Sequence, residues 1–206
     1  MYVKGFAIGK SVMDHMKMQI TKGLPEEYTE VRRFYHSLID AIEDAQYRPM
    51  WQKDIYPAPE DLHYAIEKET LYIGRCGEQI AGAMVVNQNY NEAYQHANWP
   101  NELEEGEFLV IHMLGVHSDF ARRGFAKQLV RFAIDMASEI GKKAVRLDVL
   151  NGNIPANRLY ESFGFTYVET IPMFYEDTGW MEFDLYELDL IGKRPPDLEI
   201  IDRKRM

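Results

Sequence analysis

The sequence predicts a single-domain, mixed α/β fold in which helices flank one central sheet. The 206-residue chain is long enough to bury one substantial core, because 46% of its residues are hydrophobic and only 27% are charged. Apolar runs of strand length alternate with segments whose apolar residues recur at helical spacing. No repeat and no linker rich in proline, glycine or serine divides the chain into two cores.

The N-terminal part of this domain predicts a strand followed by an amphipathic helix. We expect the strand at Met18–Thr21, and Pro25 opens the helix because proline suits a first helical turn. The apolar residues that follow recur at helical spacing and are expected to face the core: Val31, Phe34, Tyr35, Leu38, Ile42 and Ala45.

The middle of the chain predicts a helix and a hairpin between two irregular segments. Tyr47–Pro59 is rich in proline and aromatic residues and is expected to be irregular, and Glu60–Glu69 is expected to be a short helix. Leu71–Cys76 and Ile80–Asn87 predict two strands joined by a tight turn. The polar and aromatic segment Asn89–Glu105 predicts a long loop, and loops of this length are often functional.

The second half of the chain is more regular. Phe108–Val116 is almost continuously apolar, which predicts a central strand buried on both faces. Gly124 starts a helix whose apolar residues follow a 3.6-residue period, and Gly141 is placed to end it. The remaining elements are expected as a strand, a short helix and two strands, in this order: Ala144–Leu150, Pro155–Phe163, Phe165–Glu169 and Glu182–Leu190.

Composition excludes several classes of protein. The net charge of −10 and the pI of about 5.1 argue against a nucleic-acid partner and slightly favour cationic small molecules. No apolar run approaches the roughly 20 residues that span a bilayer, and residues 1–18 lack a secretion signal, so we expect no membrane partner and a cytoplasmic location. Cys76 is the only cysteine, which excludes an intrachain disulfide or a thiolate metal cluster; no metal is expected.

The expected domain covers residues 16–192. Residues 1–15 are expected to form an N-terminal extension, and residues 193–206 a C-terminal tail. The tail contains Arg203, Lys204 and Arg205, a basic run so short that it predicts a solvated end rather than a binding arm.

The turn before the Gly124 helix has features of a phosphate site. A helix N-terminus presents unpaired N–H groups and partial positive charge, and Gly124 allows an oxygen to approach the backbone closely. Arg122, Arg123 and Lys127 add positive charge to an otherwise acidic protein. The same residues fit equally well with a glycine needed for packing and with solvated basic side chains.

A second segment, Asn153–Phe165, predicts a capped helix with a tyrosine inside it. Asn153 can cap the helix, and Pro155 suits its first turn. Tyr160 follows about a turn and a half later, and by itself its position favours a core residue with its hydroxyl at the edge.

Together the two segments resemble the Gcn5-related N-acetyltransferase (GNAT) family, over Phe108–Phe165. The family's pyrophosphate motif, Gln/Arg-x-x-Gly-x-Gly/Ala, is matched at Gly124 and Ala126 and departs at Ala121. The family pattern Asn-x-x-Ala-x-x-Leu-Tyr-x-x-x-Gly-Phe is matched at Asn153, Ala156, Leu159, Tyr160, Gly164 and Phe165.

The resemblance implies a twisted mixed sheet whose two central strands, Phe108–Val116 and Ala144–Leu150, splay apart. It implies acetyl-CoA as co-substrate, with pantetheine in the opening and hydrogen-bonded to the backbone of Leu114, Gly115 and Val116. The residues implied to hold the rest of the cofactor are Arg122, Arg123, Gly124, Phe125, Ala126, Lys127, Asn153, Ala156 and Tyr160.

The resemblance also implies direct acetyl transfer to a primary amine, with Tyr160 as the acid that protonates the leaving thiolate. His112 is the first candidate for the base, because imidazole titrates near neutrality. A buried histidine that only satisfies neighbouring backbone groups explains its position equally well. Glu107 is the second candidate for the base, and His117 is expected to meet solvent.

The acceptor site is expected in the irregular segments of the first half. Aromatic side chains there could enclose a small amine or an amino-acid-like acceptor: Trp51, Tyr56, Tyr90, Tyr94 and Trp99. A protein or peptide N-acetyltransferase and a non-catalytic acyl-CoA sensor are the alternatives, and Tyr160 favours an enzyme. The resemblance also implies that a homodimer could form, because family members often associate through sheet edges or C-terminal strands, and Phe183–Leu190 is such a strand near the chain end.

Overall fold

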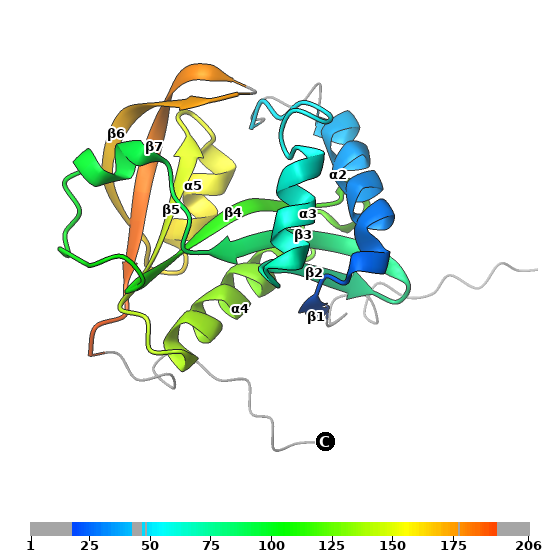
Figure 1. Ribbon diagram of the computed structural model, residues 1–206, viewed down its shortest axis with the longest axis horizontal. Helices are drawn as coiled ribbons and strands as arrows, with labels where there is room; N and C mark the ends of the chain where they lie inside the picture. The colour runs from blue at the N-terminus through cyan, green and yellow to red at the C-terminus, as the bar shows by residue number, and fades with distance from the viewer. Residues whose placement is uncertain (1–17, 43–46, 48, 177, 193–206) are drawn as a thin grey trace, which may run out of the picture.

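The computed structural model describes residues 18–42, 47, 49–176 and 178–192. These residues form one seven-stranded mixed sheet in the order β1-β2-β3-β4-β5-β7-β6 (Figure 1). The mixed α/β class is therefore confirmed. The expected extension at 1–15, the tail at 193–206 and Ala45 all lie outside the described residues. In the part of the chain that is described, no helix is long and apolar enough to cross a membrane.

Three interior strands match their predicted limits, because the limits of a buried strand follow from a local run of apolar residues. They are β2 (Leu71–Cys76), β4 (Phe108–Val116) and β5 (Ala144–Leu150). The other strands are β1 (Gln19–Lys22), β3 (Gln79–Asn87), β6 (Thr166–Tyr175) and β7 (Gly179–Asp189). β1 begins and ends one residue later than predicted, and β6 and β7 extend into a longer hairpin than predicted.

The helices follow the predicted periodicity, with limits that differ by one or two residues at several ends and with additional 3-10 turns. Pro25 opens a short 3-10 turn, η1 (Pro25–Glu27), before the regular helix begins. The predicted loop at Asn89–Glu105 contains a further 3-10 turn, η2 (Glu92–His96). The α-helices are α2 (Tyr28–Ile42), α3 (Pro59–Glu67), α4 (Phe125–Glu139) and α5 (Ile154–Glu161), and η3 (Ser118–Phe120) precedes α4.

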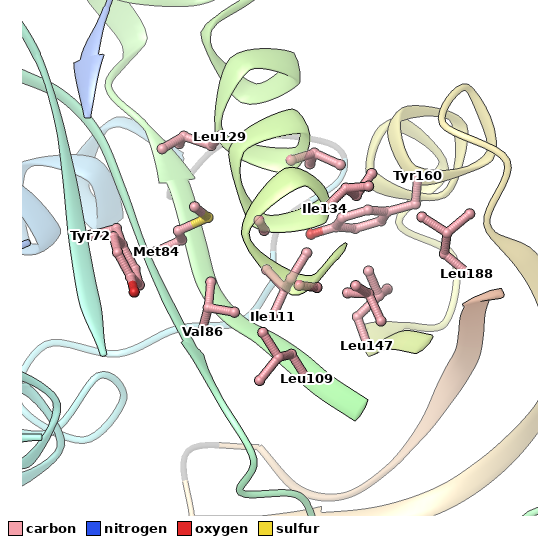
Figure 2. Close-up of a cluster of buried hydrophobic side chains, with 14 of the residues drawn as sticks. Tyr72, Met84, Val86, Leu109, Ile111, Leu129, Ile134, Leu147, Tyr160 and Leu188 are labelled. Carbon is pink, nitrogen blue, oxygen red and sulfur yellow. The ribbon is translucent and has the colours of Figure 1, made fainter. Parts of the chain in front are cut away.

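Helices cover both faces of the sheet (Figure 1). Alternate residues of β2 and β3 enter different cores, since successive strand residues point to opposite faces. Met84 and Val86 pack with α4 and α5, in the cluster drawn in Figure 2. Ala83 and Val85 pack with α2 and α3. A third cluster lies under η2, around Phe108, Val110 and Tyr94.

The centre of the sheet opens between β4 and β5. These parallel strands pair only at Phe108–Val110 with Ala144–Arg146, and beyond this point no pairing joins them. β4 also carries an irregularity opposite β3, where Met113 takes a positive φ of 52°. A bulge of this kind bends a strand and increases its twist. The expected splay of the central strands is thus confirmed.

The last strand is not an edge of the sheet. β7, which contains Phe183–Leu190 apart from its final residue, lies between β5 and β6 and pairs with both. Among the described strands, β1 and β6 form the two edges. A second copy that pairs with a sheet edge would therefore add to β1 or β6 and not to β7, and the expected homodimer itself stays a prediction.

A buried ion pair holds the η2 segment against the sheet. Arg146 Nε donates to Glu187 Oε2 at 2.8 Å, and both side chains are almost fully buried. The guanidinium carbon of Arg146 lies 4.1 Å from the ring centroid of Trp99 and 4.2 Å from that of Phe108. Asn101 accepts from Arg146 through its carbonyl and donates to Glu187 through its side chain. This cluster anchors the segment that carries Tyr94.

Candidate active site

The opening between β4 and β5 forms a cavity of about 750 Å³. It brings together most of the residues that the sequence predicts for the site. Those that line it are Trp51, Tyr56, His112, Leu114, Gly115, Val116, Arg122, Gly124, Phe125, Ala126, Lys127, Asn153, Ala156 and Tyr160. Arg123, Tyr90, Tyr94 and Trp99 do not line it.

One end of the cavity is the start of α4. Gly124 precedes the helix with a φ of 80°, and a Cβ built there meets no atom within 4 Å, so the backbone faces open space. Arg122 and Lys127 line this end of the cavity. Arg123 instead places its guanidinium carbon 5.6 Å from the centroid of the Phe120 ring. The free N–H groups and the positive charge suit a pyrophosphate.

The β4 backbone continues the site from this end. The side of β4 that faces β5 is not paired with β5 beyond Val110, so polar backbone groups there are open to an extended ligand. The Tyr35 hydroxyl on α2 donates to the Met113 carbonyl at 2.9 Å and holds the bulge in place. A Cβ at Gly115 would lie 2.6 Å from Leu38 Cδ1, so this glycine permits α2 to pack closely. These features fit the pantetheine and pyrophosphate of acetyl-CoA.

Two cofactor contacts implied by the resemblance come from α5. Asn153 accepts a hydrogen bond from the Ala156 N–H at 3.3 Å, so its side chain caps the helix. It also lines the cavity, together with Ala156. Asn153 therefore orients the start of α5 against the opening.

Tyr160 reaches the cavity from the α4 and α5 side of the sheet. Its ring packs edge-on against Phe165, with 5.5 Å between centroids, and only 7% of the residue is exposed. Figure 2 shows the ring between α4 and β5, near Ile134 and Leu147. Burial raises the pKa of Tyr160, so its hydroxyl holds its proton at neutral pH. Among the described residues this hydroxyl has no hydrogen-bond partner, which leaves it available to a ligand.

His112 reaches the cavity from the opposite face of the sheet. Its Nε2 lies 2.9 Å from the Asn89 carbonyl oxygen. A carbonyl only accepts, so Nε2 carries the proton and the neutral ring keeps its lone pair on Nδ1. Burial lowers the pKa of His112, so the ring is neutral near pH 7. His112 thus satisfies a backbone group, as one interpretation expected, and still has a basic nitrogen.

Asp148 is a cavity residue that the sequence analysis missed. Val110 on β4 and Arg146 on β5 are the last residues that pair the two strands. His112 lies two residues after Val110, and Asp148 lies two residues after Arg146. The hydroxyls of Tyr94 and Tyr175 donate to its Oδ1 at 2.8 and 3.2 Å. Burial raises the pKa of the Asp148 carboxyl, although His112 and both hydroxyls act in the opposite direction. The sequence feature that could have identified Asp148 is an aspartate within a strand of mostly apolar residues.

The remaining predicted residues have other roles. Glu107 forms an ion pair with Lys143 and lies outside the cavity, and this pairing lowers the pKa of Glu107. Tyr90 packs against Tyr94 and Phe108. The Trp99 Nε1 donates to the Tyr94 carbonyl at 2.7 Å. These aromatic residues form the wall behind Asp148, not the cavity surface.

His117 is placed differently from its prediction. We expected it to meet solvent, but its side chain is 23% exposed and its Nε2 lies 2.9 Å from Ser37 Oγ. Its Nδ1 accepts from the Asp119 N–H at 3.2 Å, so Nε2 donates to Ser37. His117 therefore ties α2 to the turn before α4.

Known proteins resemble the chain in sequence and in fold. The model of the acetyltransferase (GNAT) family matches residues 36–165. An uncharacterized N-acetyltransferase of Methanocaldococcus jannaschii is 32% identical over 84 residues, which cover 41% of this chain and 34% of that protein. The chain therefore matches only about a third of this curated relative.

Two solved structures share the fold at low sequence identity. A GNAT-family acetyltransferase from Streptococcus agalactiae has a TM-score of 0.67 and 19% identity, covering 84% of this chain and 95% of that one. Arabidopsis thaliana NAA60 in complex with acetyl-CoA has a TM-score of 0.61 and 18% identity, covering 85% and 100%. Since the family model covers more than half of the sequence, the chain belongs to the acetyltransferase (GNAT) family.

Proposed function

We propose that this protein transfers an acetyl group from acetyl-CoA to the primary amine of a small molecule. The observation that carries this proposal is the cavity that opens between β4 and β5, with Tyr160 on one side of the sheet and His112 on the other. Bound acetyl-CoA would supply an activated acetyl group and a thiolate leaving group. Its implied contacts at the start of α4 and on β4 direct the acetyl group toward this opening.

The two faces of the sheet separate the proton transfers. Tyr160 on α5 belongs to the cluster under α4 and α5, and strand alternation turns His112, next to Ile111 on β4, toward the α2 face. His112 accepts a proton from the ammonium at Nδ1, and the freed lone pair forms the new C–N bond. Tyr160 donates its proton to the departing sulfur as the C–S bond breaks, and the second proton lost by the nitrogen as the amide forms restores the Tyr160 hydroxyl. Holding both reactants in one cavity removes much of the entropic cost of their encounter.

The enclosed acceptor end favours a small molecule. The ring centroid of Tyr56 lies 6.3 Å from that of Tyr175, and Trp51 lies 5.9 Å from Tyr56. These rings come from the segment after α2 and from β6, so they meet across the cavity. A contact of this kind leaves less room for a polypeptide than for a compact amine.

The direct test is to supply acetyl-CoA with separate pools of amines, amino acids and peptides. Free CoA thiol is followed as product, and the acetylated acceptor is identified by mass. We expect release of thiol that depends on the amine pool. Turnover with peptides alone would support a protein acetyltransferase instead, and tight acetyl-CoA binding without turnover in any pool would support a sensor.

Placing a negative charge at the start of α4 is expected to weaken acetyl-CoA binding. Gly124→Glu sets a carboxylate against the implied pyrophosphate, so the Kd should rise at least about tenfold, or about 1.4 kcal/mol. Calorimetry measures this. Gly141→Glu is the matched control, since Gly141 has a φ of 73° with open space around it and lies beyond the other end of α4. Equal Kd values in the two folded variants would place the phosphates elsewhere.

Turnover is expected to depend on the protonation of His112. Burial disfavours the charged ring and lowers the pKa of His112 below 6.5, an effect that the nearby Asp148 charge opposes. The neutral, basic form therefore persists to lower pH than in an exposed histidine, and kcat should fall only as pH drops through this lowered pKa. Measuring kcat at saturating substrate concentrations across a range of pH tests this prediction. His112→Gln should remove the acidic limb and lower kcat by about 10²-fold; an unchanged limb would exclude His112 as the base.

A further inference from the structure

The charges along the cavity are separated. Among the described lining residues, Arg122 and Lys127 are the only ones with an arginine or lysine side chain, and they lie by the start of α4. Asp148 is the only acid among the same lining residues, and it accepts a hydrogen bond from Tyr175, whose ring lies beside that of Tyr56. His112, next to Asp148, is neutral near pH 7 because burial lowers its pKa. The part of the cavity around Asp148 thus has a buried carboxyl group, and none of the described lining residues beside it is a lysine or an arginine.

The Asp148 carboxylate is held firmly and is only partly occupied. Both tyrosine hydroxyls donate to the same oxygen, Oδ1. Tyr94 comes from η2 and Tyr175 from the end of β6, so two separate elements fix the carboxylate. Within the described part of the chain, Oδ2 accepts no hydrogen bond from another side chain. Oδ2 can therefore accept a hydrogen bond from a ligand.

We propose that Asp148 binds the protonated amine of the acceptor, and that it selects amines without a neighbouring carboxylate. This inference rests on the proposed acetyl transfer and narrows its acceptor to alkyl or arylalkyl amines, with amino acids excluded. A buried carboxylate stabilises an ammonium group and repels a second carboxylate in the same pocket. Aromatic faces around it add attraction for a cation. Asp148 thereby presents the ammonium to Nδ1 of His112.

The test uses acceptors matched in size. Phenethylamine is compared with phenylalanine, and cadaverine with lysine, by kcat/KM at saturating acetyl-CoA. We expect the amine of each pair to be preferred by at least about 100-fold. Phenylalanine amide has the bulk of the amino acid without its negative charge. Its kcat/KM should be within about tenfold of that for phenethylamine. This result would separate repulsion by charge from exclusion by size.

Asp148→Asn tests the residue itself, because asparagine has the same shape and still accepts from the tyrosine hydroxyls. We expect the KM for phenethylamine to rise by about 10 to 100-fold. The preference over phenylalanine should fall toward unity, and the Kd for acetyl-CoA should not change. Glu67→Gln, at the exposed end of α3, removes the same charge from the surface and should leave all three values unchanged.

The outcomes distinguish this inference from the proposed function. Acetylation of phenylalanine, lysine or a peptide as fast as the matched amine would overturn the role of Asp148 while leaving acetyl transfer intact. If Asp148→Asn lowers kcat/KM equally for the amine and for the matched amino acid, the role of Asp148 is also overturned, since a purely structural residue would affect both acceptors alike. Acetylation of no acceptor in a protein that binds acetyl-CoA would defeat both proposals. If the variant does not fold, the matched pairs and the amide still decide the question.

Discussion

Replacing Tyr160 with phenylalanine is expected to lower turnover by about 10²–10⁴-fold, the range for general acid–base groups. The Kd for acetyl-CoA should barely change, because the ring that packs against Phe165 is retained. Only the hydroxyl is lost. Burial raises the pKa of Tyr160, which keeps this hydroxyl protonated and able to donate to a thiolate. Turnover is measured under saturating acetyl-CoA with chemistry limiting the rate.

A matched control separates catalysis from packing. Tyr72 belongs to the same buried cluster and is also 7% exposed, but its hydroxyl contacts Met136 Sδ at 3.0 Å and does not line the cavity. Tyr72→Phe should keep turnover within a few-fold of the parent protein. Similar turnover in Tyr160→Phe would exclude Tyr160 as the acid, and a raised Kd with normal turnover would assign it to cofactor binding.

Removing Glu187 is expected to destabilise the fold strongly. In Glu187→Ala the Arg146 guanidinium stays buried between Trp99 and Phe108 without its carboxylate. Breaking a buried pair in this way typically costs about 3–5 kcal/mol of unfolding free energy. Urea denaturation measures this, and we expect the midpoint to fall with little change in the slope.

Two comparisons identify the cause of that loss. The double variant Arg146→Met, Glu187→Leu removes both charges and should recover most of the stability, because apolar replacements of a buried pair are often neutral. Glu69→Ala breaks the exposed pair with Lys22 and should change stability far less. A double variant as unstable as Glu187→Ala would assign the loss to packing and not to the unpaired charge.

Local patterns determined the regular elements and the cofactor end of the cavity. The limits of β2, β4 and β5 were predicted because each is a buried strand whose apolar run ends at polar or glycine residues. The start of α4 was predicted because a turn glycine with a positive φ and a helical period both act over a few residues. The proposed phosphate site uses backbone groups, and such groups are exposed wherever a turn of this kind meets a helix.

Long-range packing decided the acceptor end. Asp148, Tyr94 and Tyr175 come from three elements, and their hydrogen bonds depend on the splay of β4 from β5 and on the order of β7 and β6. Aromatic residues such as Trp99 have the same local pattern whether they line a cavity or cover a buried arginine. The sequence by itself therefore determined the family, the core strands and the start of the helix that we propose for the pyrophosphate. Only the tertiary structure decided which charged residue lines the proposed acceptor site, because a buried carboxyl group is placed by partners distant in the chain.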